Sequence, residues 1–576
     1  MGTLSTARSA CSVASAPFTE LSMRRIALAV AAPVLLTLLG AACAREAAPA
    51  ATATTKPSTA ADSAQARIET DVRALADDAM QGREAGTPGY DKAAEYVAGR
   101  MRAIGLQPAG DNESFFQQVP LLRARREQAG ARLSVVHPDR TVALRFKDQF
   151  LPALNYDRAQ AEVSAPAVFV GFGVHAPDLQ HDDFAGLDVK GKVAVLFNGA
   201  PARFDHDRRA HYSSTREKLR ALATRGAVGA VFVNTAQEEA RSPWARGAEN
   251  WPKPGMRLRG DDGKGIDTFP QLEVVAAVPA TAADLLFDGS GHLSAELFQA
   301  AIDGKLRGFA LPVTLELAAH TTIEPVQSRN VVGRLAGSDP ALAGEHLVYT
   351  AHLDHLGVGA PVNGDAIYNG ALDNALGVAI MLEAAHELVS AADKPGRSLL
   401  FVAVTAEEKG LLGAEWFATH PTVAADSLVA NINLDMPVLL APSTDVVPIG
   451  VEHSSLQGAL ETAAKEVGVL LTPDPFPEET IFVRSDQYPF IRAGIPAVYL
   501  LGGTISADGK RQPRLAFTKF LREHYHQPSD QADLPIAYGD AARLARLNAR
   551  IGRIVGDAAT RPTWNRGDFF GDKFAK

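Results

Sequence analysis

The chain has 576 residues, of which 46% are hydrophobic and 21% are charged, and 57 basic against 66 acidic side chains give it a net charge of −9. This length predicts two or more globular domains of ordinary composition. The acidic balance argues against nucleic acid as the main partner. The sequence has 2 cysteines, Cys11 and Cys43, both in or before an N-terminal targeting segment. We therefore expect any metal to be held by His, Asp and Glu side chains.

Residues 1–44 predict an export segment. Arg24 and Arg25 follow Met23, the expected start of translation, and residues 26–39 form an apolar run too short for a comfortable membrane span. Cys43 resembles the lipidated cysteine of bacterial lipoproteins, although Gly40 stands where that motif has Leu, Val or Ile. Cleavage by an ordinary signal peptidase is the alternative. Both readings predict an exported protein, either a periplasmic or outer-membrane lipoprotein attached to the membrane through Cys43, or a secreted protein.

The rest of the chain divides into segments that differ in composition and predicted secondary structure. Residues 45–61 are rich in Ala, Thr and Pro and predict a disordered linker. Helices are expected over residues 64–79 and 90–104, with Gly105 as a C-cap. Short β-prone runs such as 167–174, 192–198 and 227–234 then predict an inserted, non-catalytic module. His206 and His211 could bind a metal there, but a solvated loop over residues 205–212 is the favoured interpretation. The predicted parts are 62–150 (N-terminal part of the main domain), 151–318 (insert), 319–560 (main part) and 561–576 (C-terminal tail).

Apolar strands and helical patterns alternate in the main part. Residues 346–351, 398–406, 427–434 and 497–503 predict strands, residues 378–388 predict a helix, and Leu544, Leu547, Ile551 and Ile554 recur at helical spacing. This alternation predicts an α/β fold, with a mostly parallel, mixed sheet between layers of helices.

Polar side chains follow the predicted strands. His352 and Asp354 come after the first, Glu407 and Glu408 after the second, and Asp435 after the third. Asp373 stands before the predicted helix, and Tyr525 and His526 follow a later polar loop. Any one of these has a bland explanation, such as a solvated helix start. In open α/β sheets, however, ligands bind beyond the carboxyl ends of the strands, where all of these side chains would meet.

Five of these residues supply two imidazoles and three carboxylates, which suits two zinc ions that share one carboxylate: His352, Asp373, Glu408, Asp435 and His526. Neighbouring side chains in an extended segment point in opposite directions, so one of the two adjacent glutamates can bind metal while the other accepts a proton. Asp354 is placed to accept the second N–H of His352 and fix its tautomer.

These residues resemble the secreted dizinc exopeptidases, which include bacterial aminopeptidases, glutamate carboxypeptidases and, more distantly, glutaminyl cyclases. The resemblance covers residues 62–558 and rests on the following motifs: Gly82-Arg83, Gly86-Thr87-Pro88-Gly89, His352-x-Asp354, Asp373-Asn374, Glu407-Glu408, Asp435-Met436, Ser485-Asp486, Pro489-Phe490, Gly494-Ile495-Pro496 and Tyr525-His526. Where many relatives have Ser three residues after the aspartate, this chain has Leu376. The insert looks like a protease-associated domain, on the segments Gly171-Phe172-Gly173, Asp182-Asp183-Phe184 and 188–193.

The resemblance implies a three-layer zinc exopeptidase domain with an inserted β-rich protease-associated domain. It implies that Asp373 bridges two Zn²⁺ ions, with His352 and Asp435 at one and Glu408 and His526 at the other. Glu407 would be the general base, and Tyr525 would hydrogen-bond the oxyanion. The expected activity is that of an aminopeptidase acting on peptides through a water between the two ions. A carboxypeptidase or dipeptidase, a glutaminyl cyclase and an inactive receptor-like binding protein remain as alternatives.

Overall fold

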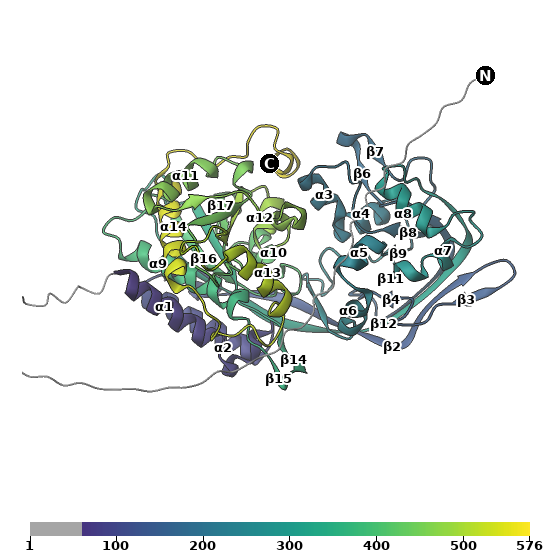
Figure 1. The fold of residues 1–576 in the computed structure, drawn as a ribbon, viewed down its shortest axis with the longest axis horizontal. Coiled ribbons are helices and arrows are strands. Elements are labelled where there is room, and N and C mark those ends of the chain that lie inside the picture. Colours follow the sequence, from purple (N-terminus) through teal and green to yellow (C-terminus); the bar gives the residue numbers. More distant parts are fainter. Residues whose placement is uncertain (1–59, 576) are drawn as a thin grey trace, which may run out of the picture. The chain divides into compact units, whose positions relative to one another are not determined.

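The computed structural model describes residues 60–575, so the predicted export segment and Cys43 lie outside the described residues. The centre of the main domain is a set of four parallel strands, two of which, β16 and β17, are labelled in Figure 1. In spatial order they are β20 (Ala497–Gly502), β17 (Leu428–Asn433), β13 (His346–His352) and β16 (Ser398–Val404). The strands β18 (Asp445–Ile449) and β12 (Phe309–Leu335) pair antiparallel at the two sides. The predicted mixed, mostly parallel sheet is confirmed.

Helices cover both faces of this sheet. Tyr349 and its alternate neighbours on β13 join a core with α1 (Ala60–Leu75), α2 (Pro88–Ile104), α9 (Leu376–Ser390), α11 (Leu456–Val467) and α14 (Tyr538–Asp557). Val348, whose side chain points to the other face, packs with α10 (Leu412–Thr419) and α12 (Gln487–Arg492). Figure 1 shows α9 and α14 on one side of β16 and β17, and α10 and α12 on the other. The predicted three layers follow from this alternation.

A long antiparallel ribbon connects the main domain to the insert. The strand β2 (Phe116–Val136) pairs along most of its length with β12, which binds β16 near its C-terminal end and β5 (Gln160–Phe169) near its N-terminal end. Beyond β5, the parallel strands β8 (Val193–Phe197), β9 (Gly229–Val233) and β11 (Val274–Val278) extend the sheet. The predicted boundary at residue 318 therefore falls inside a strand.

The remaining described elements are short. The strands are β1 (Gln107–Pro108), β3 (Thr141–Ala143), β4 (Leu151–Pro152), β6 (His175–Ala176), β7 (His181–Asp182), β10 (Gly255–Leu258), β14 (Gly357–Val362), β15 (Asp365–Tyr368) and β19 (Leu470–Leu471). The helices are α3 (His206–Ser213), α4 (Thr215–Thr224), α5 (Ala236–Arg241), α6 (Trp244–Asn250), α7 (Asp284–Phe287), α8 (Ser294–Ile302), α13 (Pro513–Glu523) and α15 (Phe569–Phe574). Among the described residues, no helix is both long and apolar enough to cross a membrane.

Some sequence-based boundaries were wrong. The helix expected over residues 64–79 ends at Leu75, because Asp77 caps a separate short turn beginning at Asp78. The expected loop at residues 205–212 is the helix α3, capped by Asp205. His211 is buried on this helix, and burial lowers its pKa to about 3. Neither it nor His206 belongs to a group of metal-ligating side chains in the described part of the chain.

The segment expected to be a C-terminal tail is folded against the rest of the protein. Phe569 and Phe570 of α15 are buried, and α15 contacts α3 of the insert and α12 of the main domain. The Nδ1 atom of His453 lies 2.6 Å from an oxygen of Asp568, and its Nε2 atom lies 3.9 Å from oxygens of Asp207 and Glu452. Burial disfavours the charged ring, but Asp568, Asp207 and Glu452 outweigh it and raise the pKa of His453.

This contact predicts a pH-dependent contribution to stability. Because the folded pKa of His453 exceeds the unfolded value of about 6.5, the contribution is complete below that value and is lost as pH rises through the folded pKa. We expect His453→Gln to cost about 1.5–3 kcal/mol near pH 6 and less at alkaline pH. Thermal unfolding from pH 6 to 9 measures this, with His292→Gln at an exposed position as the control. A deficit that stays constant across this range would contradict the assignment.

Candidate metal centre

The predicted site residues come together beyond the carboxyl ends of three parallel strands. His352 is the last residue of β13, Glu407 and Glu408 lie three and four residues after β16, and Asp435 lies two residues after β17. Asp373 lies in a short π-helical turn, Ala371–Ala375, that leads directly into α9. His526 lies three residues beyond the end of α13. Loops from distant parts of the chain thus supply one cluster.

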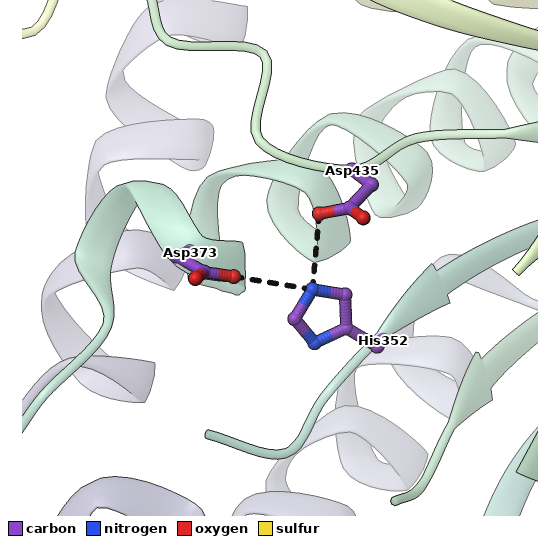
Figure 2. Close-up of side chains that lie close together, drawn as sticks. All are labelled: His352, Asp373 and Asp435. Carbon is purple, nitrogen blue, oxygen red and sulfur yellow. Dashed lines mark hydrogen bonds and ion pairs between the residues drawn. The ribbon is translucent and has the colours of Figure 1, made fainter. Parts of the chain in front are cut away.

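His352 faces two carboxylates. Its Nε2 atom lies 3.0 Å from Oδ1 of Asp435 and 3.2 Å from Oδ1 of Asp373, as Figure 2 shows. All three residues are buried, and they form a group whose donor atoms could hold one metal ion. We refer to them as the first cluster.

The other oxygen of Asp373 faces a second group. Oδ2 of Asp373 lies 3.4 Å from Nε2 of His526 and 3.8 Å from Nδ1 of His355. Oε2 of Glu408 lies 3.2 Å from His526, and Oε1 of Glu408 lies 2.8 Å from His355. His355, Asp373 and Glu408 form a group whose donor atoms could hold one metal ion, and His526 lies outside that group but contacts its two carboxylates. We refer to these four residues as the second cluster, and Asp373 belongs to both clusters.

The electrostatics of the site favour a cation. Although burial opposes it, contacts with His352 and His526 hold the pKa of Asp373 well below its usual range. The same balance of burial against histidine contacts lowers the pKa of Glu408 to about 2. Glu408 and Asp373 in turn outweigh burial and raise the pKa of His526 to about 10. A buried set of carboxylates that holds protons on its histidines this strongly would also attract a divalent ion.

Several donor atoms of the site have no hydrogen-bond partner within the protein, which also fits a metal site. Both ring nitrogens of His355 and Oε1 of Glu408 are buried without a hydrogen-bond partner. Buried polar atoms in proteins almost always have a partner, so atoms of this kind indicate an ion that they could coordinate. Imidazole nitrogen and carboxylate oxygen without thiolate suit zinc in a catalytic type of site.

The contacts of Asp354 differ from the sequence-based prediction. Nδ1 of His352 lies 3.1 Å from the carbonyl oxygen of Asp354, not from its carboxylate. The carboxylate instead accepts hydrogen bonds from the backbone N–H groups of Glu407 and Glu408, at 3.0 and 3.3 Å. The reason is geometric, since the loop after β13 turns the Asp354 side chain toward the loop after β16. Asp354 thus positions both glutamates.

Glu407 lies beside the clusters and is half-buried. Burial, with Asp435, Asp486 and Glu408 nearby, raises its pKa well above the usual glutamate range despite the opposing effect of His352. A carboxylate with a raised pKa is suited to accept a proton near neutral pH. Tyr525 stacks on the ring of His526, with centroids 3.8 Å apart, and so lies beside the second cluster.

Further side chains hold the ligand loops. Ser485 donates to Oδ2 of Asp435 at 2.6 Å, and Tyr499 donates to the Asp435 carbonyl at 2.7 Å. The Asp530 carboxylate accepts the backbone N–H of Asp373 at 3.0 Å. Leu376, the departure from the relatives' pattern, is fully buried in the main core, so an apolar contact occupies its position.

Arg83 holds the backbone of the segments that carry the proposed ligands. Its fully buried guanidinium donates to the carbonyl oxygens of Leu75, Leu353, Asn369 and Gly370 at 2.5–3.0 Å. These bonds connect the end of α1 with the loops that carry His352 and Asp373.

Sequence reasoning missed His355. It stands three residues after His352 and one after Asp354, where the chain has already left the strand. A count of every histidine near the strand end could have found it. The spacing alone does not tell which way the side chain points.

Residues 330–551 match the sequence pattern of the family described as "Peptidase family M28". A "Glutamate carboxypeptidase 2 homolog" from Caenorhabditis elegans is 24% identical over 392 residues, which cover 59% of this chain and 46% of that protein. The chain thus spans about half the length of the first curated relatives that it matches.

Two other matches cover a larger share of the matched protein's length. A "Probable lipoprotein aminopeptidase LpqL" from Mycobacterium tuberculosis is 24% identical over 469 residues, or 78% of this chain and 76% of that protein. The solved structure "Aminopeptidase from Aneurinibacillus sp. strain AM-1" aligns with a TM-score of 0.50 at 19% identity, over 86% of this chain and 95% of that one. This structural likeness concerns the fold.

The hydrogen bond from Ser485 to Asp435 yields a prediction about metal binding. Ser485→Ala removes the donor that orients this carboxylate, and loss of such an outer contact typically weakens metal affinity about 10–100-fold. We expect an ion held at the first cluster to bind more weakly. Competition with a chelator measures this, and Ser398→Ala, a buried serine at the opposite end of β16, is the control. Unchanged affinity in Ser485→Ala would contradict the role.

Proposed function

We propose that this chain, whose residues 330–551 belong to peptidase family M28, is an exported dizinc aminopeptidase that removes N-terminal residues from peptides. The observation that carries the proposal is the division of the Asp373 carboxylate, since Oδ1 faces His352 and Oδ2 faces His526. A carboxylate with one oxygen toward each of two donor clusters is suited to bridge two ions. His352 and Asp435 would hold one Zn²⁺, and Glu408 and His526 would hold the other.

The residues beside the clusters support a hydrolytic mechanism. Zinc, when bound, would polarise the scissile carbonyl and lower the pKa of the attacking water. Glu407 takes the proton from that water and returns it to the leaving amine, a role for which its raised pKa and half-buried position are suited. The Asp354 carboxylate holds Glu407 in place by accepting a hydrogen bond from the backbone N–H of Glu407. The hydroxyl group of Tyr525 donates a hydrogen bond to the developing oxyanion.

The preference for an aminopeptidase rests on the relatives' names and not on a residue that reads the substrate's amino group. A carboxypeptidase or dipeptidase could use the same metal ligands. The complete donor set and Glu407 favour an active dizinc enzyme over a one-zinc glutaminyl cyclase or an inactive binding protein. A panel of free and N-terminally blocked peptides separates these, since an aminopeptidase should cleave only those with a free amine. The predicted insert, whose C-terminal boundary lies within β12 and not at residue 318, would be a protease-associated domain, and the sheet and helices of the main domain would be the peptidase domain.

The two adjacent glutamates test the assignment. Glu407→Gln cannot accept the proton, so we expect both zinc ions to remain and kcat to fall about 10²–10⁴-fold. Glu408→Gln should instead lose one of two zinc ions. Elemental analysis and kcat on both variants, with the wild type expected to hold close to two zinc ions, provide the measurement. Zinc loss in Glu407→Gln with only a rate loss in Glu408→Gln would reverse the two roles.

The site of attachment is a separate proposal. Cys43 would carry a lipid anchor, which would place the enzyme at the outside of the cytoplasmic membrane or on the outer membrane. We expect incorporation of a fatty-acid analogue into the wild type but not into Cys43→Ser. Unlabelled wild-type protein, released in soluble form, would support simple signal cleavage instead.

A further inference from the structure

His355 has an environment that hydrogen bonding within the protein does not explain. Its side chain is fully buried, and both Nδ1 and Nε2 are without a hydrogen-bond partner. Oε1 of Glu408 lies 2.8 Å from Nδ1, yet this oxygen also has no hydrogen bond. The two atoms are close, but they do not meet the geometry of a hydrogen bond. Two ligands of one ion can lie in this way, because each directs a lone pair at the ion and not at the other ligand.

The placement of the donor atoms supports a ligand role. One ligand atom each from His355, Asp373 and Glu408 lie within 4.8 Å of one another, so these three residues could hold one metal ion. Nε2 of His526 lies 3.4 Å from Oδ2 of Asp373 and 3.2 Å from Oε2 of Glu408, so His526 faces the same two carboxylates. The rings of His355 and His526 approach edge to face, with centroids 5.8 Å apart.

From this geometry we propose that His355 is a zinc ligand, which joins Asp373, Glu408 and His526 and gives the second position four protein ligands. The first position keeps the three ligands His352, Asp373 and Asp435. Structural zinc sites typically have four protein ligands, whereas catalytic sites have three and an open position. The two positions are therefore unequal. The second would hold its ion tightly, and the first would be the one that leaves a coordination position free for water or the substrate carbonyl.

A different role for His355 is the main competitor. Its Nδ1–H could donate to Glu408 and orient that carboxylate without touching the ion. Asparagine distinguishes the two roles, because its side-chain NH₂ group takes roughly the place of Nδ1–H but is a poor metal ligand. An orienting role should therefore be rescued by His355→Asn, whereas a ligand role should not.

The test measures metal and does not depend on peptidase activity. Wild type, His355→Ala, His355→Asn and His526→Ala are stripped of metal, reloaded with zinc and titrated against a chelator of known affinity. We expect both His355 variants to weaken one of the two zinc ions by 10²-fold or more, about as much as His526→Ala does, while the other ion is retained. Loss of an outer contact would cost less, about 10–100-fold. Cobalt-loaded protein gives a second readout, since the visible absorption of the tighter-bound ion should change in both variants.

The matched control is His346, a buried histidine at the start of β13, the strand that precedes His355, and its Nδ1 lies 2.9 Å from Oγ of Ser427. His346→Asn should keep both ions. Thermal unfolding of the metal-free proteins checks that each variant is folded.

The outcomes separate the ligand role of His355 from the existence of the metal centre. Affinity restored in His355→Asn, or unchanged in His355→Ala, overturns the ligand role. The inference rests on the proposed metal centre, and the wild-type zinc count tests that centre separately. A wild type with one zinc ion that His355→Ala loses would refute the dizinc proposal and uphold the ligand role. A wild type that binds no zinc would refute both.

Discussion

The structure depends on how a buried carboxylate, that of Asp373, is compensated. The residue is 2% exposed, and a charge so far from water is costly unless other groups neutralise it. His352 faces one of its oxygens, and His526 and His355 face the other. The backbone around Asp373 is held in turn by the Asp530 carboxylate and by the start of α9. Strands, loops and helices from distant parts of the chain therefore bring these three histidines to the Asp373 carboxylate, where they can neutralise its charge as cations or as ligands of a bound metal.

Loops alone would not hold such a geometry, so their backbone groups are tied by side chains. Arg83 binds four carbonyl oxygens, and Asp354 accepts two N–H groups of the loop after β16. Asn374 donates to the carbonyl of Leu434 and accepts from the N–H of Met436, next to Asp435. None of these is a proposed ligand. Each fixes a segment that carries one, and such preorganisation is what a reactive site requires.

The sequence predicted the sheet, its layers and the convergence of five donor residues, because apolar strands followed by His, Asp or Glu have a strong local pattern. It could not predict the direction of the Asp354 side chain or the orientation of His355, since both are set by loops that pack on residues far away in sequence. The helix α3 was missed because its charged sequence resembles a solvated loop, and Tyr212 and His211 become apolar contacts only when α15 packs on them. Tertiary packing overrides local character in both cases.

The two clusters also differ in their access to water. In the first, His352 is 1% and Asp435 is 6% exposed, and Ser485 and Tyr499 occupy the hydrogen-bonding positions behind Asp435. In the second, the His526 side chain is 25% exposed. Water screens charge and competes for an ion, so His526 is the ligand at which an ion in the second cluster would first meet solvent. The other three members of that cluster are as buried as the first cluster, since the side chains of His355, Asp373 and Glu408 are at most 5% exposed. His355 would thus add to the second cluster a donor that water does not reach.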